Sequence, residues 1–176
     1  MTDWDAVVRE HGPLVWRTAC RLLTHEADAA DCFQRTFLAA VELEAAEPIR
    51  NWPAALKRLA TARALEQLRA RYRDAGRLAD LPDEPPGDPS ALEPVDFAAG
   101  GELASALRVA LAAIDPVQAE LFCLVCLEDL SYSDAAAQLG VTVNHAGVLL
   151  HRARAALRER LRAFDPHREH TSGGHS

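Results

Sequence analysis

Long β-branched runs are almost absent from this sequence of 176 residues, and alanine and leucine dominate its apolar half. Alanine and leucine have a high helix propensity, whereas strands are enriched in valine, isoleucine and threonine. The composition therefore predicts an all-α protein. Its length allows one large domain, or two small ones that each bury a modest core.

A membrane-spanning segment and an export signal are also lacking. No stretch approaches the roughly 18 uninterrupted apolar residues that a membrane-spanning helix needs. The N-terminal residues show no basic segment followed by an apolar run, which is the pattern of a secretory signal. We therefore expect a soluble, cytoplasmic protein without membrane insertion.

The sequence offers no residue pattern for catalysis, so we expect no enzyme, no metal and no cofactor. It has no glycine-rich phosphate loop and no paired nucleophile and base. Cys123 and Cys126 have the two-residue gap that zinc sites and thiol oxidoreductases use. They lie in an apolar helical run without a second ligand pair, so we interpret them as core residues. A redox or metal role is the alternative.

The net charge of −7 conceals two basic segments. Residues 1–49 carry nine acids and four arginines, and residues 80–102 carry seven acids and no base. By contrast, residues 50–77 hold eight cations against two acids, and residues 152–162 hold five arginines against Glu159. Two DNA contacts separated by acidic surface would explain this pattern, and so would two helices whose cations support solubility.

Three helices are expected in the first half. The first covers residues 4–23 and should restart or bend at Gly12-Pro13, because proline disrupts a helix interior. The second covers residues 27–44, and the third runs from near Asn51, which can cap it, to about residue 72. On the second helix, apolar residues share one face: Ala30, Phe33, Phe37, Leu38 and Val41. A polar stripe lies opposite, as on a solvated or docking surface: Asp28, Asp31, Gln34 and Arg35.

The third helix carries the first basic segment. Its apolar residues should face inward: Leu56, Leu59, Ala60, Ala64, Leu65 and Leu68. Its cations are expected to lie largely outside: Lys57, Arg58, Arg63, Arg69, Arg71 and Arg73.

A linker and a second group of helices are expected in the second half. Residues 80–101 are rich in proline and acids and show no periodic apolar face, which predicts a linker. A helix over 102–114 follows, and the next begins at Asp115 and Pro116 and is buried over 117–127. Residues 131–162 predict a helix-turn-helix that reverses at Gly140, where a left-handed backbone costs glycine little. A packed helical hairpin with a solvated charged face is the alternative.

Three segments, in this order, resemble the motifs of extracytoplasmic-function sigma factors, which are bacterial RNA polymerase sigma factors of the sigma-70 family. Residues 28–37, DAADCFQRTF, are similar to the polymerase-binding helix of that family. Residues 52–73, WPAALKRLATARALEQLRARYR, are similar to its minus-ten helix. The sequences LSYSDAA at 130–136, LG at 139–140 and HRAR at 151–154 resemble the helix-turn-helix that binds the minus-thirty-five element.

The resemblance covers about residues 4–164 and implies a transcription initiation factor with two helical domains. A three-helix domain of sigma region 2 type would occupy residues 1–79, and a linker residues 80–101. A four-helix domain of sigma region 4 type would occupy residues 102–165, followed by a disordered tail over 166–176.

The resemblance also implies partners and contact residues. The partners would be the clamp helices and flap of core RNA polymerase, and promoter DNA, with an anti-sigma factor as a further candidate. Polymerase would be bound by Asp28, Asp31, Gln34, Arg35 and Phe37, although Phe37 also fits a core position. The minus-ten DNA would be bound by Arg50, Asn51, Lys57, Arg58, Arg63, Arg69, Arg71 and Arg73. The minus-thirty-five DNA would be bound by Thr142, Asn144, His145, His151, Arg152, Arg154 and Arg158.

The expected recognition helix departs from the family's pattern. Where relatives often read Thr-Val-Lys-Ser-Arg, residues 145–149 read HAGVL, so the usual lysine and arginine are missing. Asn144 can still pair with adenine. We expect weaker base readout, or readout carried by phosphate contacts and DNA shape. Two alternatives follow: a helix-turn-helix regulator that binds duplex DNA alone, and a sigma-shaped interaction protein that reads DNA poorly.

Overall fold

The computed structural model describes residues 1–78 and 101–162, with side chains over 1–76 and 101–162. The regular elements of these residues are all helical, which confirms the all-α prediction. They are α1 (Trp4–Leu22), α2 (Glu26–Ala46), α3 (Trp52–Leu78), α4 (Gly101–Ala113), α5 (Pro116–Phe122), the π-helical turn η2 (Cys123–Leu127), α6 (Tyr132–Leu139) and α7 (Val143–Arg160). The expected linker and tail lie outside the described residues, except for Gly101, which begins α4.

Side-chain caps determine where several helices begin. Asn51 accepts a hydrogen bond from the Ala54 N–H at 3.1 Å, and Asp115 accepts from the N–H groups of the two residues after Pro116. Ser131 caps α6 in the same way. Each oxygen pairs with a backbone donor that has no partner within its helix. The starts at Asn51 and Asp115 are those that the sequence predicts, and α6 begins where the helix-turn-helix is expected to begin.

Helix α1 is continuous through Gly12 and Pro13, so the expected restart is wrong, and the alternative of a bend stays a prediction. A proline inside a helix costs about 3 kcal/mol. The helix offsets this cost by burying Val15, Ala19 and Leu22. Gly12 is buried beside Phe33 of α2, and a Cβ added at Gly12 would lie 3.7 Å from the Phe33 ring. The packing of α1 against its neighbours therefore outweighs the tendency of Pro13 to break the helix.

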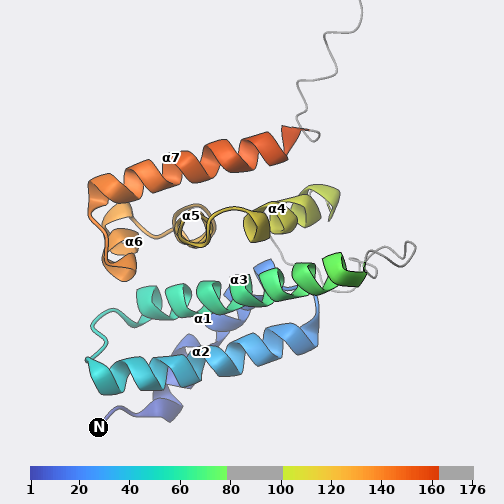
Figure 1. The fold of residues 1–176 in the computed structure, drawn as a ribbon. Helices are drawn as coiled ribbons and strands as arrows, with labels where there is room; N and C mark the ends of the chain where they lie inside the picture. The colour runs from blue at the N-terminus through green and yellow to red at the C-terminus, as the bar shows by residue number, and fades with distance from the viewer. Residues whose placement is uncertain (79–100, 163–176) are drawn as a thin grey trace, which may run out of the picture.

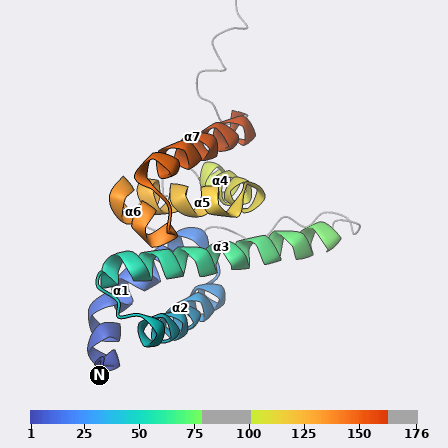
Figure 2. The same cartoon turned by 60° about the vertical axis from the view of Figure 1, so that its left-hand side comes forward.

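The helices lie in layers with α3 in the middle. In Figure 1, α7 lies over α4, α5 and α6, while α1 and α2 lie on the other side of α3. Figure 2, turned by 60°, shows the same order. One core cluster spans these layers and includes Leu22 of α1, Leu65 of α3, Leu111 of α4, Cys123 of η2 and Leu157 of α7. The helices before and after residues 79–100 therefore pack against each other in a closed arrangement.

The buried face of α2 differs from the expected one. The helix buries the small residues Ala29, Cys32, Thr36, Ala39 and Ala40, together with Phe37. Ala30, Leu38 and Val41, expected inside, are exposed, with Leu38 at 64% and Val41 at 43%. Small side chains let α2 approach α1 and α3 closely. A buried face made of small residues is missed when the periodicity is judged from large apolar residues alone.

Cys123 is a core residue, as predicted, whereas Cys126 is only half-buried. Burial raises the pKa of the Cys123 thiol well above its usual range. Both lie in η2 rather than in a continuous α-helix. Within the residues that the structure describes, no three His, Cys, Asp or Glu side chains gather as metal ligands would.

None of the helices in the described ranges combines the length and apolarity that crossing a lipid bilayer requires.

Candidate nucleic-acid interface

The outer side of α2 presents a mixed polar and apolar stripe, the α2 face, formed by Asp31, Gln34, Leu38 and Val41. The spacing of three or four residues places these exposed side chains on one side of the helix. Asp31 accepts a hydrogen bond from Gln67 Nε2 of α3 at 2.8 Å, which holds its carboxylate in position. An acid, an amide and two exposed apolar groups in line provide the kind of surface on which a partner helix can pack.

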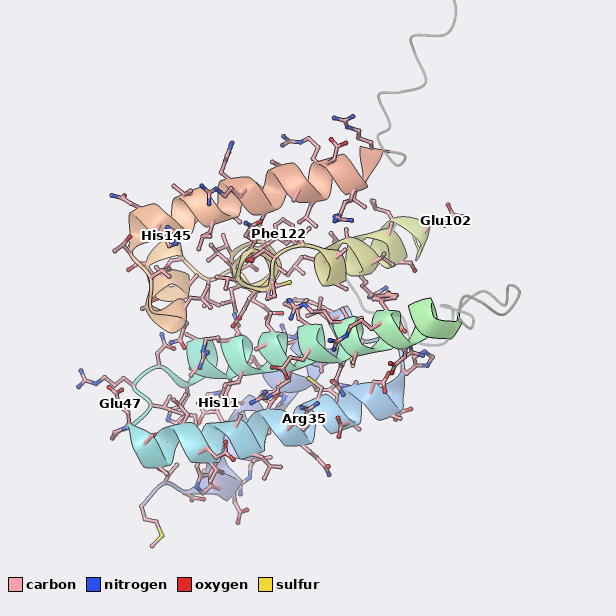
Figure 3. All side chains as sticks on the ribbon, in the orientation of Figure 1. His11, Arg35, Glu47, Glu102, Phe122 and His145 are labelled. Carbon is pink, nitrogen blue, oxygen red and sulfur yellow. The ribbon has the colours of Figure 1, made fainter. Side chains whose placement is uncertain are left out.

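Three of the residues expected at this face are engaged elsewhere. Phe37 is only 9% exposed and packs in the core, with its ring centroid 5.0 Å from that of Phe33. It supports the helix rather than offering a contact. Asp28 pairs with Arg71 of α3 at 2.6 Å, so two residues expected at different sites bind each other. In Figure 3, Arg35 lies between α2 and α3, and its guanidinium is 3.8 Å from Glu66.

The cations of α3 do not form one outer surface. Lys57 Nζ donates a hydrogen bond to the backbone oxygen of Glu128 at 2.7 Å, which ties α3 to the C-terminal half. Arg58 and Arg69 lie near Glu120 of α5, and the Nε atoms of both arginines are buried without a hydrogen-bond partner. The expectation that these three cations lie outside is therefore wrong. They face the layer formed by the second half of the chain.

The remaining basic residues of this segment divide into paired and exposed groups. Arg63 pairs with Glu66 at 3.0 Å, and Asn51 is used as the cap of α3. Arg50 and Arg73 are exposed and form no ion pair with another described side chain. Among the cations of this segment whose side chains the structure describes, these last two are the most available to a nucleic acid in the closed arrangement.

A buried ionic cluster joins the two halves. Arg21 Nη1 of α1 lies 2.9 Å from Glu128 Oε1, and Thr18 donates to the other carboxylate oxygen at 3.0 Å. Arg108 Nε of α4 donates to the backbone oxygen of Arg21 at 3.1 Å. Glu128 is only 6% exposed. We call these groups the Arg21–Glu128 cluster. Sequence reasoning missed it, because the charged partners are 107 positions apart and no local pattern links them.

Helices α6 and α7 form the predicted helix-turn-helix. Gly140 adopts a left-handed conformation, with φ of 65°, and the Val141 N–H reaches the Ala136 carbonyl at 3.0 Å. The Gly140 N–H also donates to the Ala137 carbonyl at 3.3 Å, and the two hydrogen bonds close the turn as a Schellman motif. Thr142 then accepts from the His145 N–H at 3.1 Å and caps α7. Thr142 was expected at the DNA, and its hydroxyl is already used to start the helix.

The exposed side of α7 changes character along its length. Its N-terminal half presents Asn144, Val148 and His151, while the opposite side buries Ala146 and Leu149. Figure 3 places His145 at the turn between α6 and α7. Further along, Arg152, Arg154, Arg158 and Arg160 are exposed. Arg154 also contacts the Cys126 sulfur at 3.7 Å.

This division suits binding to duplex DNA. In helix-turn-helix proteins, the N-terminal residues of the second helix contact base edges in the major groove. Arginines spaced along an exposed helix suit phosphates, which lie on both sides of the groove. Asn144, Val148 and His151 share one side of α7 by their spacing, and the arginines that follow are exposed on the same helix. Val148 was not singled out from the sequence, and the DNA contacts of this helix stay a prediction.

Comparisons with known proteins match both halves. The family model for sigma-70 region 2 matches residues 7–74, and that for sigma-70, region 4 matches residues 104–157. The chain is 32% identical over 168 residues to the ECF RNA polymerase sigma factor SigE of Mycolicibacterium smegmatis. That alignment covers 92% of this chain and 62% of the relative, so the chain spans about three fifths of the relative's length.

The fold is also similar to a solved structure. The sigma factor RpoE, in its co-crystal structure with the anti-sigma factor NepR from Bartonella quintana, matches with a TM-score of 0.56 and 23% identity. The match covers 92% of this chain and 98% of that one. At this level of identity, the likeness supports the fold of the described helices.

Proposed function

The chain belongs to the sigma-70 family, and we propose that it acts as a transcription initiation factor that directs core RNA polymerase to a subset of promoters. The observation that carries this proposal is the order of two surfaces. The α2 face lies within the segment that matches region 2, and the segment that matches region 4 covers α6, the turn and α7 as far as residue 157. The two segments, 1–79 and 102–165, would be the two functional domains.

Polymerase would be bound by the α2 face. Asp31 and Gln34 are exposed and can accept and donate hydrogen bonds, while Leu38 and Val41 leave apolar area that a partner helix would bury. An apolar patch with polar groups at its edge is a common composition for a protein interface. The clamp helices of polymerase would provide the partner surface, and the flap would contact the C-terminal half.

Promoter DNA would be bound by both halves. Arg50 and Arg73 are exposed and can bind phosphates of the minus-ten element. Lys57, Arg58 and Arg69 could join this surface only after the C-terminal half moves away from α3, because they face it in the closed arrangement. The exposed side of α7 would bind the minus-thirty-five element.

The same proposal extends to the mode of action, the cofactor requirement, the location and a further partner of the chain. It would act by binding and not by catalysis, without a metal or cofactor, and in the cytoplasm, where polymerase and the chromosome are found. The similar fold was solved with an anti-sigma factor bound. An anti-sigma factor is therefore a candidate partner for this chain too.

Run-off transcription with purified core polymerase on a promoter library tests the proposal. We expect the full chain to direct initiation at a defined motif. Changing Asp31 and Gln34 together to alanine should abolish polymerase binding, whereas Glu10→Ala, an exposed change on α1, should not. Specific duplex binding without polymerase would favour a simple helix-turn-helix regulator. Polymerase binding without promoter selection would favour a sigma-shaped interaction protein.

A further inference from the structure

The exposed side of α7 has an apolar residue at its centre. Asn144, Val148 and His151 follow one another at intervals of four and three residues, and all three are exposed. Val148 is 47% exposed. It therefore lies between two side chains that can form hydrogen bonds, on the part of the helix that enters the groove in helix-turn-helix proteins.

The neighbouring glycine makes this position accessible to a ligand. A Cβ added at Gly147 would meet no atom within 4 Å, so packing inside the chain does not require a glycine there. A glycine in a helix interior costs about 1 kcal/mol relative to alanine. A helix backbone without a side chain allows a close approach of another molecule. Because Gly147 has no side chain, another molecule can approach the helix backbone closely beside Val148. The isopropyl group of Val148 then extends beyond its neighbour.

The major groove of DNA contains one apolar group that such a side chain can contact, the C5-methyl group of thymine. Asparagine can pair with adenine through two hydrogen bonds. Asn144 and Val148 are four residues apart, which is about 6 Å along a helix. Because base pairs are spaced by about 3.4 Å, the two side chains would address base pairs roughly two steps apart.

We propose that Val148 is a specificity-determining residue that contacts a thymine methyl group in the minus-thirty-five element, about two base pairs from an adenine bound by Asn144. This inference rests on the proposed function. It explains how a recognition helix without the lysine and arginine usual in relatives can still select bases. Selection would come from apolar contact at one base pair and from a single amide at another.

Deoxyuridine substitution tests the contact directly, because deoxyuridine differs from thymidine only by the missing methyl group. Duplex promoters selected by the full chain with polymerase would carry deoxyuridine at one thymine of the upstream element at a time. The affinity of the complex would be measured by competition. We expect one position at which the wild-type complex loses about fourfold in affinity, the factor that burial of one methyl-sized group contributes.

Variants then assign that loss to Val148. Val148→Ala should bind the thymine promoter several-fold more weakly and should no longer distinguish thymine from deoxyuridine at that position. Val109→Ala, a matched change at a half-exposed valine of α4, should keep the full distinction.

Two results would overturn the inference. One is a wild-type complex that is insensitive to every thymine replacement. The other is a Val148→Ala variant that remains as sensitive as the wild type. Failure of the wild-type chain to form any promoter complex would contradict the proposed function itself, and the inference with it.

Discussion

Glu128 connects three segments of the chain. Its two carboxylate oxygens accept from Arg21 and Thr18 of α1, and its backbone oxygen accepts from Lys57 of α3. The two buried charges, on Arg21 and Glu128, each compensate the other for the loss of contact with water. Removing one of two buried, paired charges leaves the second without compensation, and this costs more than the pair itself contributes.

We expect Glu128→Ala to lower the free energy of unfolding by up to about 3–5 kcal/mol, the range for breaking a buried ion pair. Arg21 keeps its hydrogen bond to the Leu127 backbone oxygen, which moderates the loss. Urea unfolding, followed by circular dichroism, would measure the loss. Glu159→Ala removes an exposed ion pair with Arg162 and should cost less than about 1 kcal/mol. Equal losses in the two variants would show that the Arg21–Glu128 cluster is not the stabilising contact that the geometry indicates.

Glu120 behaves differently because no hydrogen bond satisfies its buried Oε1 atom. Burial raises the pKa of this carboxyl, and the nearby Arg58 and Arg69 oppose the rise without cancelling it. The folded chain therefore holds a proton here over a pH range in which the unfolded chain has released it. Stability is lost as the pH rises through that range and is regained as it falls.

Glu120→Gln should accordingly raise the melting temperature at pH 7.5, and the gain should shrink as the pH falls toward the unfolded-state pKa of glutamate, about 4.3. Thermal unfolding of both proteins across this range would show it. A lower melting temperature for the variant at pH 7.5 would mean that attraction to the two arginines outweighs desolvation.

At the scale of elements, two glycines in one motif have opposite roles. Gly140 has a positive φ of 65°, which a residue with a Cβ adopts at a cost of roughly 1–2 kcal/mol. Gly147 lies inside α7 with open space around it. Its cost arises from the flexibility of the unfolded chain.

Gly140→Ala should therefore destabilise the protein by about 1 kcal/mol, and Gly147→Ala should stabilise it by up to about 1 kcal/mol. Each variant serves as the control for the other in denaturant unfolding. Changes of the same sign in both would contradict the backbone account of the turn.

Features of an element that depend on neighbouring residues could be predicted from the sequence. The caps at Asn51, Asp115 and Ser131 and the turn at Gly140 depend on hydrogen bonds within a few residues. Which face of α2 is buried, and whether α1 continues through Pro13, could not be predicted. Both depend on how closely α1, α2 and α3 pack. The pairing of Asp28 with Arg71 is likewise a tertiary contact.

The candidate site divides in the same way. The sequence predicted the exposed arginines of α7 from their spacing on one helix. It could not show that Lys57, Arg58 and Arg69 face the second half of the chain, because that depends on α5 and η2 packing on α3. Val148 was missed because an exposed valine has no polar signature.

At the scale of the whole molecule, the closed arrangement conflicts with simultaneous binding of two promoter elements. Elements centred near positions −10 and −35 are about 25 base pairs apart, which is roughly 85 Å of duplex. A compact chain of this size has a radius of gyration of about 16 Å. The proposed function therefore requires the two halves to separate on the promoter.

Energy transfer between two dyes would detect the separation. Cysteines introduced at Glu10 of α1 and Glu159 of α7, both exposed, would carry the dyes after Cys20 and Cys126 are changed to serine. We expect high transfer efficiency in the free chain and a large decrease in the complex with polymerase and promoter. An efficiency that stays high in the active complex would contradict separation.

Under the proposed function, the Arg21–Glu128 cluster would also affect how much polymerase the chain can capture. Closure joins two parts of one chain, so its equilibrium does not change when the protein is diluted, whereas binding to polymerase does. The α2 face is exposed in the closed form, but contact of the C-terminal half with the flap would need the open form. If both contacts are required for binding, the apparent dissociation constant equals the intrinsic one divided by the open fraction. With about one molecule in ten open, polymerase would be bound about tenfold more weakly. Substitutions in this cluster would thus change the dose of factor that transcription needs, although the cluster lies between the two halves and outside the α2 face and the exposed side of α7.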